Sequence, residues 1–212
     1  MKKVLLAVCV LMAVAGVARA LDHWPAPWEE NPADPQWAGG VTTAQAWEFS
    51  DNAFDPNYVQ NEFGDPAIVI AGAEYPSWVL PPEGDGEIPT WHINDAAGGI
   101  VCLIIPNNPD ENQRKVMWLQ ITSTKAPSDL RTIPEGTISY PKPDLQCANG
   151  WYIYTAQVDI PFNPPSESIA YDFPYCTNIE EIVVKTICVP EPATMAMLGL
   201  GGLAVLWRKR RK

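Results

Sequence analysis

Three carboxylates at alternate positions are the residues in this sequence best suited to bind a metal. Glu83, Asp85 and Glu87 are separated by Gly84 and Gly86 in a loop that is rich in proline and glycine. Carboxylate oxygens are the ligands that calcium prefers, and glycines allow a loop to wrap around the ion. The spacing is not that of an EF-hand, and a solvated acidic loop is the alternative. We therefore expect either calcium or no cofactor.

Flat indole rings are the second feature that could bind a ligand, because aromatic faces stack on the apolar faces of sugar rings. Tryptophans in expected strands, such as Trp118, should pack in the core. The better candidates for sugar stacking lie in loops or at loop edges, namely Trp24, Trp28, Trp37 and Trp78. Burial in apolar hollows is the alternative at these positions too.

No catalytic motif stands out in the sequence. The nucleophile elbow, the zinc-protease helix, the phosphate loop and the dinucleotide fingerprint are all missing. His23 and His92 are the only histidines, and no serine or cysteine is placed as an obvious partner. Pairs of carboxylates that could hydrolyse sugars would arise by chance in so acidic a chain. We therefore predict that the protein is not an enzyme.

The two ends of the chain predict where the protein goes. Residues 1–20 have a basic start, an apolar run and a small-residue ending at Ala18 and Ala20, which is the pattern of a secretory signal peptide. Residues 189–212 combine the motif Pro190-Glu191-Pro192, a short apolar run and a basic end. The apolar run is short of the roughly 20 residues that span a bilayer comfortably. The basic end resists translocation and should stay cytoplasmic.

This tail resembles the PEP-CTERM sorting signal of bacterial surface proteins. The resemblance implies a Gram-negative-type bacterium and an exosortase-type membrane protease that cuts at the motif. It also implies that the chain is tethered through a short C-terminal hydrophobic helix before it is processed. An ordinary C-terminal transmembrane anchor, with the same topology, is the alternative. The central region resembles uncharacterised proteins with this signal, which transfers no active site.

Four cysteines remain after Cys9 leaves with the signal peptide, and an even number in an exported domain favours disulfides. We expect Cys176 to pair with Cys188 and Cys102 with Cys147. Free buried thiols are the alternative. A zinc site is not favoured, because no pair of cysteines is spaced as C-x-x-C.

Charge excludes one class of partner. The chain has a formal net charge of −11, and its basic residues concentrate in the two ends, so the region between them is more acidic still. Such a surface repels phosphate backbones, and we expect no nucleic-acid partner.

The elements expected between the two ends are short strands. Residues 21–40 carry many prolines and should be extended, covering the domain without regular structure. Residues 41–188 should form the folded domain. Strands are expected at 42–50, 67–71, 78–80, 90–93, 99–105, 115–122, 151–160 and 179–187. The strand at 99–105 is apolar throughout and is expected to be buried on both faces.

Many short strands with turns rich in proline and glycine predict an all-β fold, a jelly-roll-like β-sandwich. The expected protein is exported and non-catalytic, and lies at the cell surface or in the extracellular matrix. Its role would be structural or carbohydrate-binding, within exopolysaccharide or biofilm. A secreted hydrolase of matrix polysaccharide and a protein–protein adhesion module are the alternatives.

Overall fold

The computed structural model describes residues 25–49, 55–56, 58–79, 88–107, 113–140, 142, 144–146 and 150–190. Almost all of the regular structure in these residues is β-strand. Their two short helical turns are α2 (Pro27–Glu30) and η2 (Pro35–Trp37). The strands are β1 (Val41–Glu48), β2 (Tyr58–Gln60), β3 (Ala67–Ala71), β4 (Ala73–Val79), β5 (Ile88–Ile93), β6 (Gly99–Pro106), β7 (Gln113–Ser123), β8 (Asp129–Ile133), β9 (Thr137–Ser139), β10 (Leu145–Gln146), β11 (Tyr152–Ile160), β12 (Ser166–Phe173) and β13 (Thr177–Pro190).

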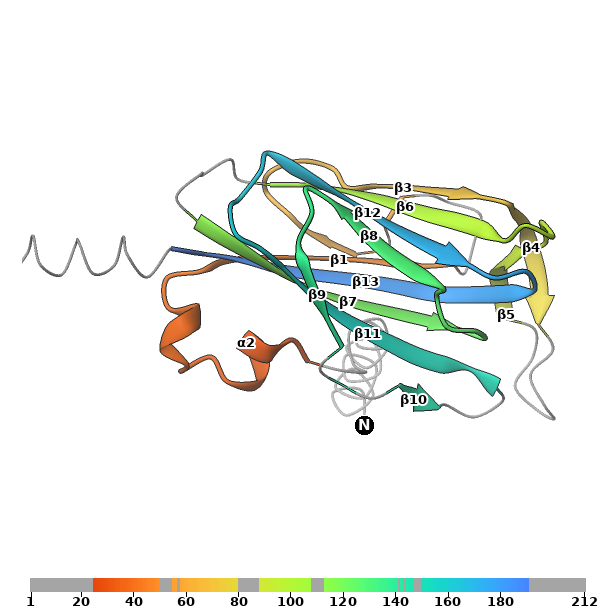
Figure 1. The fold of residues 1–212 in the computed structure, drawn as a ribbon, viewed down its shortest axis with the longest axis horizontal. Coiled ribbons are helices and arrows are strands. Elements are labelled where there is room, and N and C mark those ends of the chain that lie inside the picture. The colour runs from red at the N-terminus through yellow and green to blue at the C-terminus, as the bar shows by residue number, and fades with distance from the viewer. Residues whose placement is uncertain are drawn as a thin grey trace, which may run out of the picture.

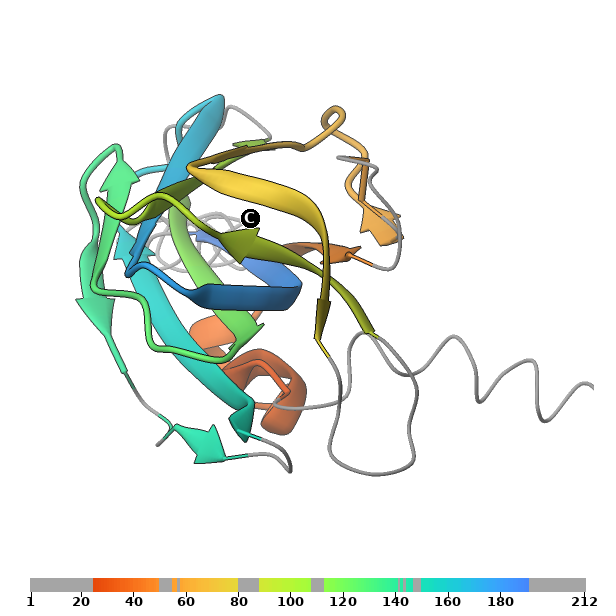
Figure 2. The ribbon, with the colours of Figure 1, turned by 90° about the vertical axis from the view of Figure 1, so that its right-hand side faces the viewer.

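The strands form two antiparallel sheets that lie face to face (Figures 1 and 2). The larger sheet has the order β10-β11-β7-β13-β1-β2, with β5 beside the start of β13, β4 beside β5, and β9 on the outer edge of β11. The smaller sheet has the order β3-β6-β12-β8. The all-β sandwich expected from the sequence is confirmed, and its architecture is that of a jelly-roll-like sandwich.

Alternation along each strand places the core between the two sheets. In β7, Met117, Leu119 and Ile121 point toward the smaller sheet, and they belong to the main cluster of buried side chains. They are met by Leu103 of β6 and Ile169 of β12, both fully buried. The two sheets therefore hold each other mainly through apolar burial, which contributes about 25 cal/mol for each Å² removed from water.

The opposite face of the larger sheet is covered by the segment that precedes β1. Trp28 and Trp37 meet edge to face, with ring centroids 5.7 Å apart. They pack on the outward side chains of β7 and β13, namely Val116, Trp118, Ile187 and Val189. A salt bridge of 2.7 Å between Glu29 Oε2 and Lys185 Nζ ties the same segment to β13. Figure 1 shows α2 on the side of the larger sheet away from β6 and β12.

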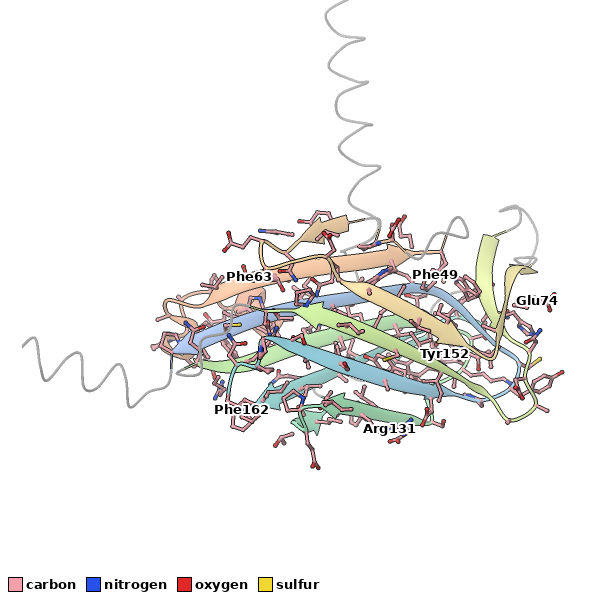
Figure 3. All side chains as sticks on the ribbon, turned by 90° about the horizontal axis from the view of Figure 1, so that it is seen from above. Phe49, Phe63, Glu74, Arg131, Tyr152 and Phe162 are labelled. Atoms are coloured by element: carbon pink, nitrogen blue, oxygen red, sulfur yellow. The ribbon has the colours of Figure 1, made fainter. Side chains whose placement is uncertain are left out.

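Strand β6 was expected to be buried on both faces, and this expectation is wrong. Its burial alternates, and Ile100 and Ile104 are each 43% exposed. The smaller sheet is thus open on its outer face, and an apolar sequence does not reveal that one of its two faces is uncovered. At the edge of this sheet, Arg131 of β8 donates a hydrogen bond of 2.7 Å to the carboxylate of Asp172 of β12. Arg131 is labelled in Figure 3.

The expected disulfide between Cys176 and Cys188 is wrong. Cys176 directly precedes β13, and Cys188 lies near the other end of the same strand. A strand rises roughly 3.3 Å per residue, so the two cysteines are several times farther apart than the ~7 Å that a disulfide can bridge. Among the described residues, Cys102, Cys176 and Cys188 form no disulfide. Cys147, the expected partner of Cys102, lies outside the described residues. Within the described ranges, no helix has the length and apolar character needed to cross a membrane.

Candidate functional site

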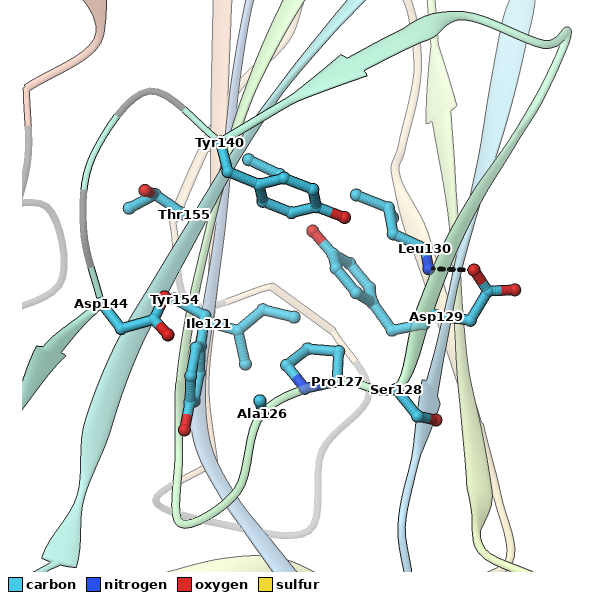
Figure 4. A pocket seen from close by; sticks show the side chains of 12 residues that line it. Ile121, Ala126, Pro127, Ser128, Asp129, Leu130, Tyr140, Asp144, Tyr154 and Thr155 are labelled. Carbon is cyan, nitrogen blue, oxygen red and sulfur yellow. Dashed lines mark hydrogen bonds between the residues drawn. The ribbon is translucent and has the colours of Figure 1, made fainter.

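A pocket of about 360 Å³ opens where the two sheets part, between β11 and the connection from β7 to β8. Tyr154 lines one side of it and Leu130, at the start of β8, lines the other. Pro127 of the connection forms part of the floor, and Tyr140, just after β9, lies over the pocket (Figure 4). Asp144 completes the side next to Tyr154. The site therefore draws on segments that are far apart in the sequence.

Three tyrosines line the pocket, namely Tyr140, Tyr154 and Tyr171. Tyr140 is 68% exposed, and Tyr154 is half-buried. The ring of Tyr154 stacks on that of Tyr152, with centroids 5.9 Å apart and an interplanar angle of 28°. This stacking holds the half-buried ring in one orientation. The pocket thus has two flat apolar faces, each with a hydroxyl group at one end.

The hydroxyl groups of Tyr154 and Tyr171 stay protonated at neutral pH. Burial, with the nearby Asp144 carboxylate and Tyr152, raises the pKa of Tyr154 to about 12. Burial and the neighbouring Tyr140 raise the pKa of Tyr171, beneath the pocket, well above its usual value. Each group can therefore donate a hydrogen bond as well as accept one.

The remaining polar groups of the pocket are neutral or acidic. Asp129 accepts a hydrogen bond from the backbone N–H of Leu130 at 3.0 Å, drawn as a dashed line in Figure 4. Ser128 Oγ donates to the carbonyl of Asp172 at 3.1 Å. Among the residues that the structure describes, no lysine, arginine or histidine lines the pocket. This arrangement suits a neutral ligand with many hydroxyl groups and offers nothing to pair with an anion.

The tryptophans named from the sequence do not contribute to this pocket. Trp28 and Trp37 are only 6% and 8% exposed, because they cover the outer face of the larger sheet. Neither can offer an indole face to a sugar, so the expectation of exposed rings is corrected for these two. Trp24 and the side chain of Trp78 lie outside the described residues.

Other expected site residues also fall outside the described ranges, namely Glu83, Asp85 and Glu87 of the acidic loop and Glu191 and Pro192 of the sorting motif. Among the described residues, no group of three or more His, Cys, Asp and Glu side chains could hold a metal ion. Pro190 is described and is the last residue of β13. The motif therefore begins directly where a central strand of the larger sheet ends.

Sequence reasoning missed the tyrosines of the pocket. One signal was present: Tyr152 and Tyr154 alternate in a strand and so share a face, and that face continues as apolar at Ala156 and Val158. Two aromatic residues at the end of an inward face indicate a place where the core opens. The contribution of Tyr140 had no local signal, because it depends on how the segment after β9 is laid against β11.

Solved structures similar to this chain include several carbohydrate-binding modules. A family 35 module from Clostridium thermocellum is 14% identical, with 57% of this chain and 98% of that chain covered and a TM-score of 0.32. A family 35 module from Cellvibrio japonicus is 15% identical, with coverages of 56% and 92% and a TM-score of 0.28. A family 27 module that recognises mannan is 11% identical, with coverages of 72% and 98% and a TM-score of 0.31. Similarities this distant do not carry a binding site from one protein to another. No curated protein matches the chain.

The end of the chain matches a family model. Residues 189–211 match the model of the PEP-CTERM protein-sorting motif. The match covers the proline–glutamate–proline motif, the apolar run and most of the basic end that the sequence had singled out. Residues 189–211 are thus a PEP-CTERM sorting signal, which implies export, association with the cell surface and processing by exosortase.

Proposed function

We propose that the domain is a sugar-binding module displayed at the cell surface, and that the tyrosine-lined pocket between β8 and β11 is its binding site. The observation that carries the proposal is the pairing of two ring faces, at Tyr140 and Tyr154, with hydroxyl and carboxylate groups in one pocket. A volume of about 360 Å³ lies within the roughly 300–1,000 Å³ of small-molecule sites. The role is adhesive or structural within exopolysaccharide rather than catalytic.

The ligand that fits this chemistry is a neutral polysaccharide. Ring faces of a pyranose stack on tyrosine, and its hydroxyl groups donate to Asp129 and Asp144. A uronic acid would bring its own negative charge next to these carboxylates, and none of the described residues that line the pocket is basic and could offset it. The module should therefore select neutral over anionic polymers. Because no ion pair is involved, its binding should change little between low and high salt.

The test is affinity electrophoresis of the mature domain in gels that contain neutral or anionic polysaccharides. We expect retardation by a neutral polymer, and Tyr140→Ala or Tyr154→Ala should weaken it by about tenfold, equivalent to ~1.4 kcal/mol. Tyr154→Phe keeps the ring, so its smaller loss measures the hydroxyl alone. Tyr175→Ala is the matched control, because Tyr175 is 52% exposed and lies outside the pocket.

Two results would reject the pocket as a sugar site. One is binding that is unchanged in both tyrosine variants. The other is that no polymer retards the parent domain, in which case the role of the domain is purely structural. Retardation by anionic polymers alone would contradict the assigned selectivity.

We further infer that the chain is tethered to the membrane through its C-terminal segment until exosortase cuts it. In a host that has exosortase, the surface protein should lack the residues after about Thr194. Glu191→Ala should leave the tail in place, because it removes the acidic centre of the motif. Intact-mass spectrometry that found Arg208 to Lys212 on the surface-localised protein would contradict this inference.

A further inference from the structure

Three polar side chains meet inside the core at one end of the sandwich. They are Asn107, which follows β6, Lys115 of β7, and Glu167 of β12. Their exposed fractions are 4%, 0% and 1%. Lys115 Nζ contacts both Asn107 Oδ1 and Glu167 Oε1, and Asn107 Nδ2 donates to Glu167 Oε2. One carboxyl group therefore bridges the amine of the lysine and the amide nitrogen of the asparagine.

The three side chains are enclosed by apolar neighbours. In the larger sheet, Lys115 lies opposite Ile160 of β11 and Cys188 of β13, which are 0% and 1% exposed. In the smaller sheet, Glu167 lies opposite Ile105, which is also fully buried. The backbone N–H of Asn107 donates to Pro165 O at 2.9 Å and fixes the residue where β6 ends. Water is thus kept away from the group, and its geometry is set by both sheets.

The dry surroundings favour the uncharged forms of the acid and the base. Burial lowers the pKa of the Lys115 amine, against the opposing effect of Glu167. Burial likewise raises the pKa of Glu167 to about 7, although Lys115 acts in the other direction. An uncharged amine has a free electron pair and is a nucleophile, and a protonated carboxyl group is a general acid.

We propose that Lys115 and Asn107 join spontaneously in an intramolecular isopeptide bond, with Glu167 as the catalytic residue. Lys115 Nζ attacks Asn107 Cγ, and a C–N bond forms while the Asn107 carbonyl oxygen takes up negative charge. Glu167 accepts a proton from the attacking nitrogen and delivers a proton to Asn107 Nδ2. The bond between Cγ and Nδ2 then breaks and ammonia leaves. The products are a secondary amide and one molecule of ammonia, and no oxidant, reductant or cofactor is required.

The contacts of Glu167 are the ones that this reaction needs. One carboxyl oxygen contacts the nucleophile and the other contacts the leaving group, so a single residue can move the proton between them. A second buried lysine shows the contrast. Lys185 is paired with Glu29 at 2.7 Å, and that carboxylate otherwise accepts from a backbone N–H, that of Ala26. Lys185 bonds to a carboxylate, and no side-chain amide among the described residues is bonded to this pair, so it is a natural control.

The bond would link the two sheets covalently. Asn107 follows β6 of the smaller sheet, and Lys115 lies in β7 of the larger sheet. In Figure 1 these ends of β6 and β7 lie at the same end of the sandwich as the end of β13, where the sorting motif begins. A covalent link at this end would keep the sheets together when the chain is pulled through its C-terminal segment. This is a useful property for a protein held at a cell surface.

The experiment is mass spectrometry of the exported domain under denaturing conditions. The proposal requires a mass lower than that of the sequence by about 17 Da, the mass of the ammonia that leaves when Asn107 acylates the lysine. Digestion with trypsin and a glutamate-specific protease should then give a branched peptide that joins residues 88–111 to residues 115–125. Cleavage after Lys115 should be absent, because its side chain is blocked.

Three variants separate the reaction from simple burial of an ion pair. Glu167→Gln and Asn107→Ala should each have the full sequence mass and be cleaved after Lys115. Lys185→Arg should keep the mass deficit, since it leaves the three reacting groups in place. These readings are taken on denatured protein, and the parent chain alone already decides the matter if a variant fails to fold.

Each alternative gives a different result, and each would overturn the proposal. The full sequence mass in the parent would show that the cluster is a buried ion pair only. Loss of ammonia with normal cleavage after Lys115 would indicate a cyclic imide at an asparagine. Loss of water in place of ammonia would make Glu167 the acyl partner.

Discussion

Replacing Glu181 by glutamine should stabilise the domain at alkaline pH and leave it nearly unchanged in acid. Glu181 is 7% exposed. Its pKa is raised from 4.5 to about 8, chiefly by burial and then by the nearby carboxylates of Glu48 and Glu180. The folded state therefore holds a proton that the unfolded chain releases above pH 4.5. Between pH 4.5 and pH 8 stability falls as pH rises, and above pH 8 the whole cost of ionising a buried carboxyl group is present.

The size of this cost follows from the shift in pKa. Each pKa unit corresponds to about 1.4 kcal/mol, so the shift of Glu181 amounts to at most roughly 4–5 kcal/mol at pH 9. Glutamine has nearly the same shape and never ionises, and so Glu181→Gln should recover much of this amount. At pH 5 the two proteins should differ by less than about 1 kcal/mol, because the carboxyl group is then mostly protonated when folded.

Urea unfolding at pH 5 and pH 9, followed by tryptophan fluorescence, measures both values. Comparing the variant with its parent cancels the contributions of other groups, including Glu167, which are common to both. Glu62→Gln is the control, because Glu62 is exposed and its removal should give the same small change at both pH values. The reasoning fails if Glu181→Gln gives no more stabilisation at pH 9 than at pH 5, which would mean that the carboxylate is solvated or paired.

Two further predictions concern the core and the thiols. Trp118→Ala should lower the free energy of unfolding by about 3–5 kcal/mol, because Trp118 is fully buried under the segment before β1. Phe162→Ala is the control: its side chain is 46% exposed, and its removal should change the free energy of unfolding by less than ~1 kcal/mol. Equal effects of the two variants in urea unfolding would contradict this assignment. A maleimide should label Cys176 in the folded domain and Cys188 only after denaturation, since the first thiol is exposed and the second is buried. If neither residue is labelled in denatured, unreduced protein, the two cysteines form a disulfide after all.

The alternation of residues 115–122 shows how far a local pattern reaches. Alternation puts Val116 and Trp118 on one face of the strand, and these two side chains belong to the cluster on the outer side of the larger sheet. Met117, Leu119 and Ile121 share the other face and belong to the main core. A strand's period of two fixes which residues share a face. It does not say what covers each face. Trp28 and Trp37 are buried because they pack on apolar side chains of the outer face of the larger sheet. That apolar face forms only when the strands come together in the sheet.

Both candidate sites show the same limit. Tyr154 could be noticed from its spacing with Tyr152, but Asp129 and Tyr140 join it only because β8 and the segment after β9 lie against β11. Asn107, Lys115 and Glu167 stand beside polar turns or at strand ends, where a sequence indicates solvated side chains.

By itself the sequence determined the sorting signal, the all-β class and most of the strands. These properties are written in contiguous residues: a motif is recognised by a receptor or protease as a linear segment, and strand periodicity is a local property. Only the tertiary structure decided which side chains lose their water and which meet. Burial shifts pKa values and creates pockets through contacts between residues distant in the chain, and no local pattern encodes those contacts.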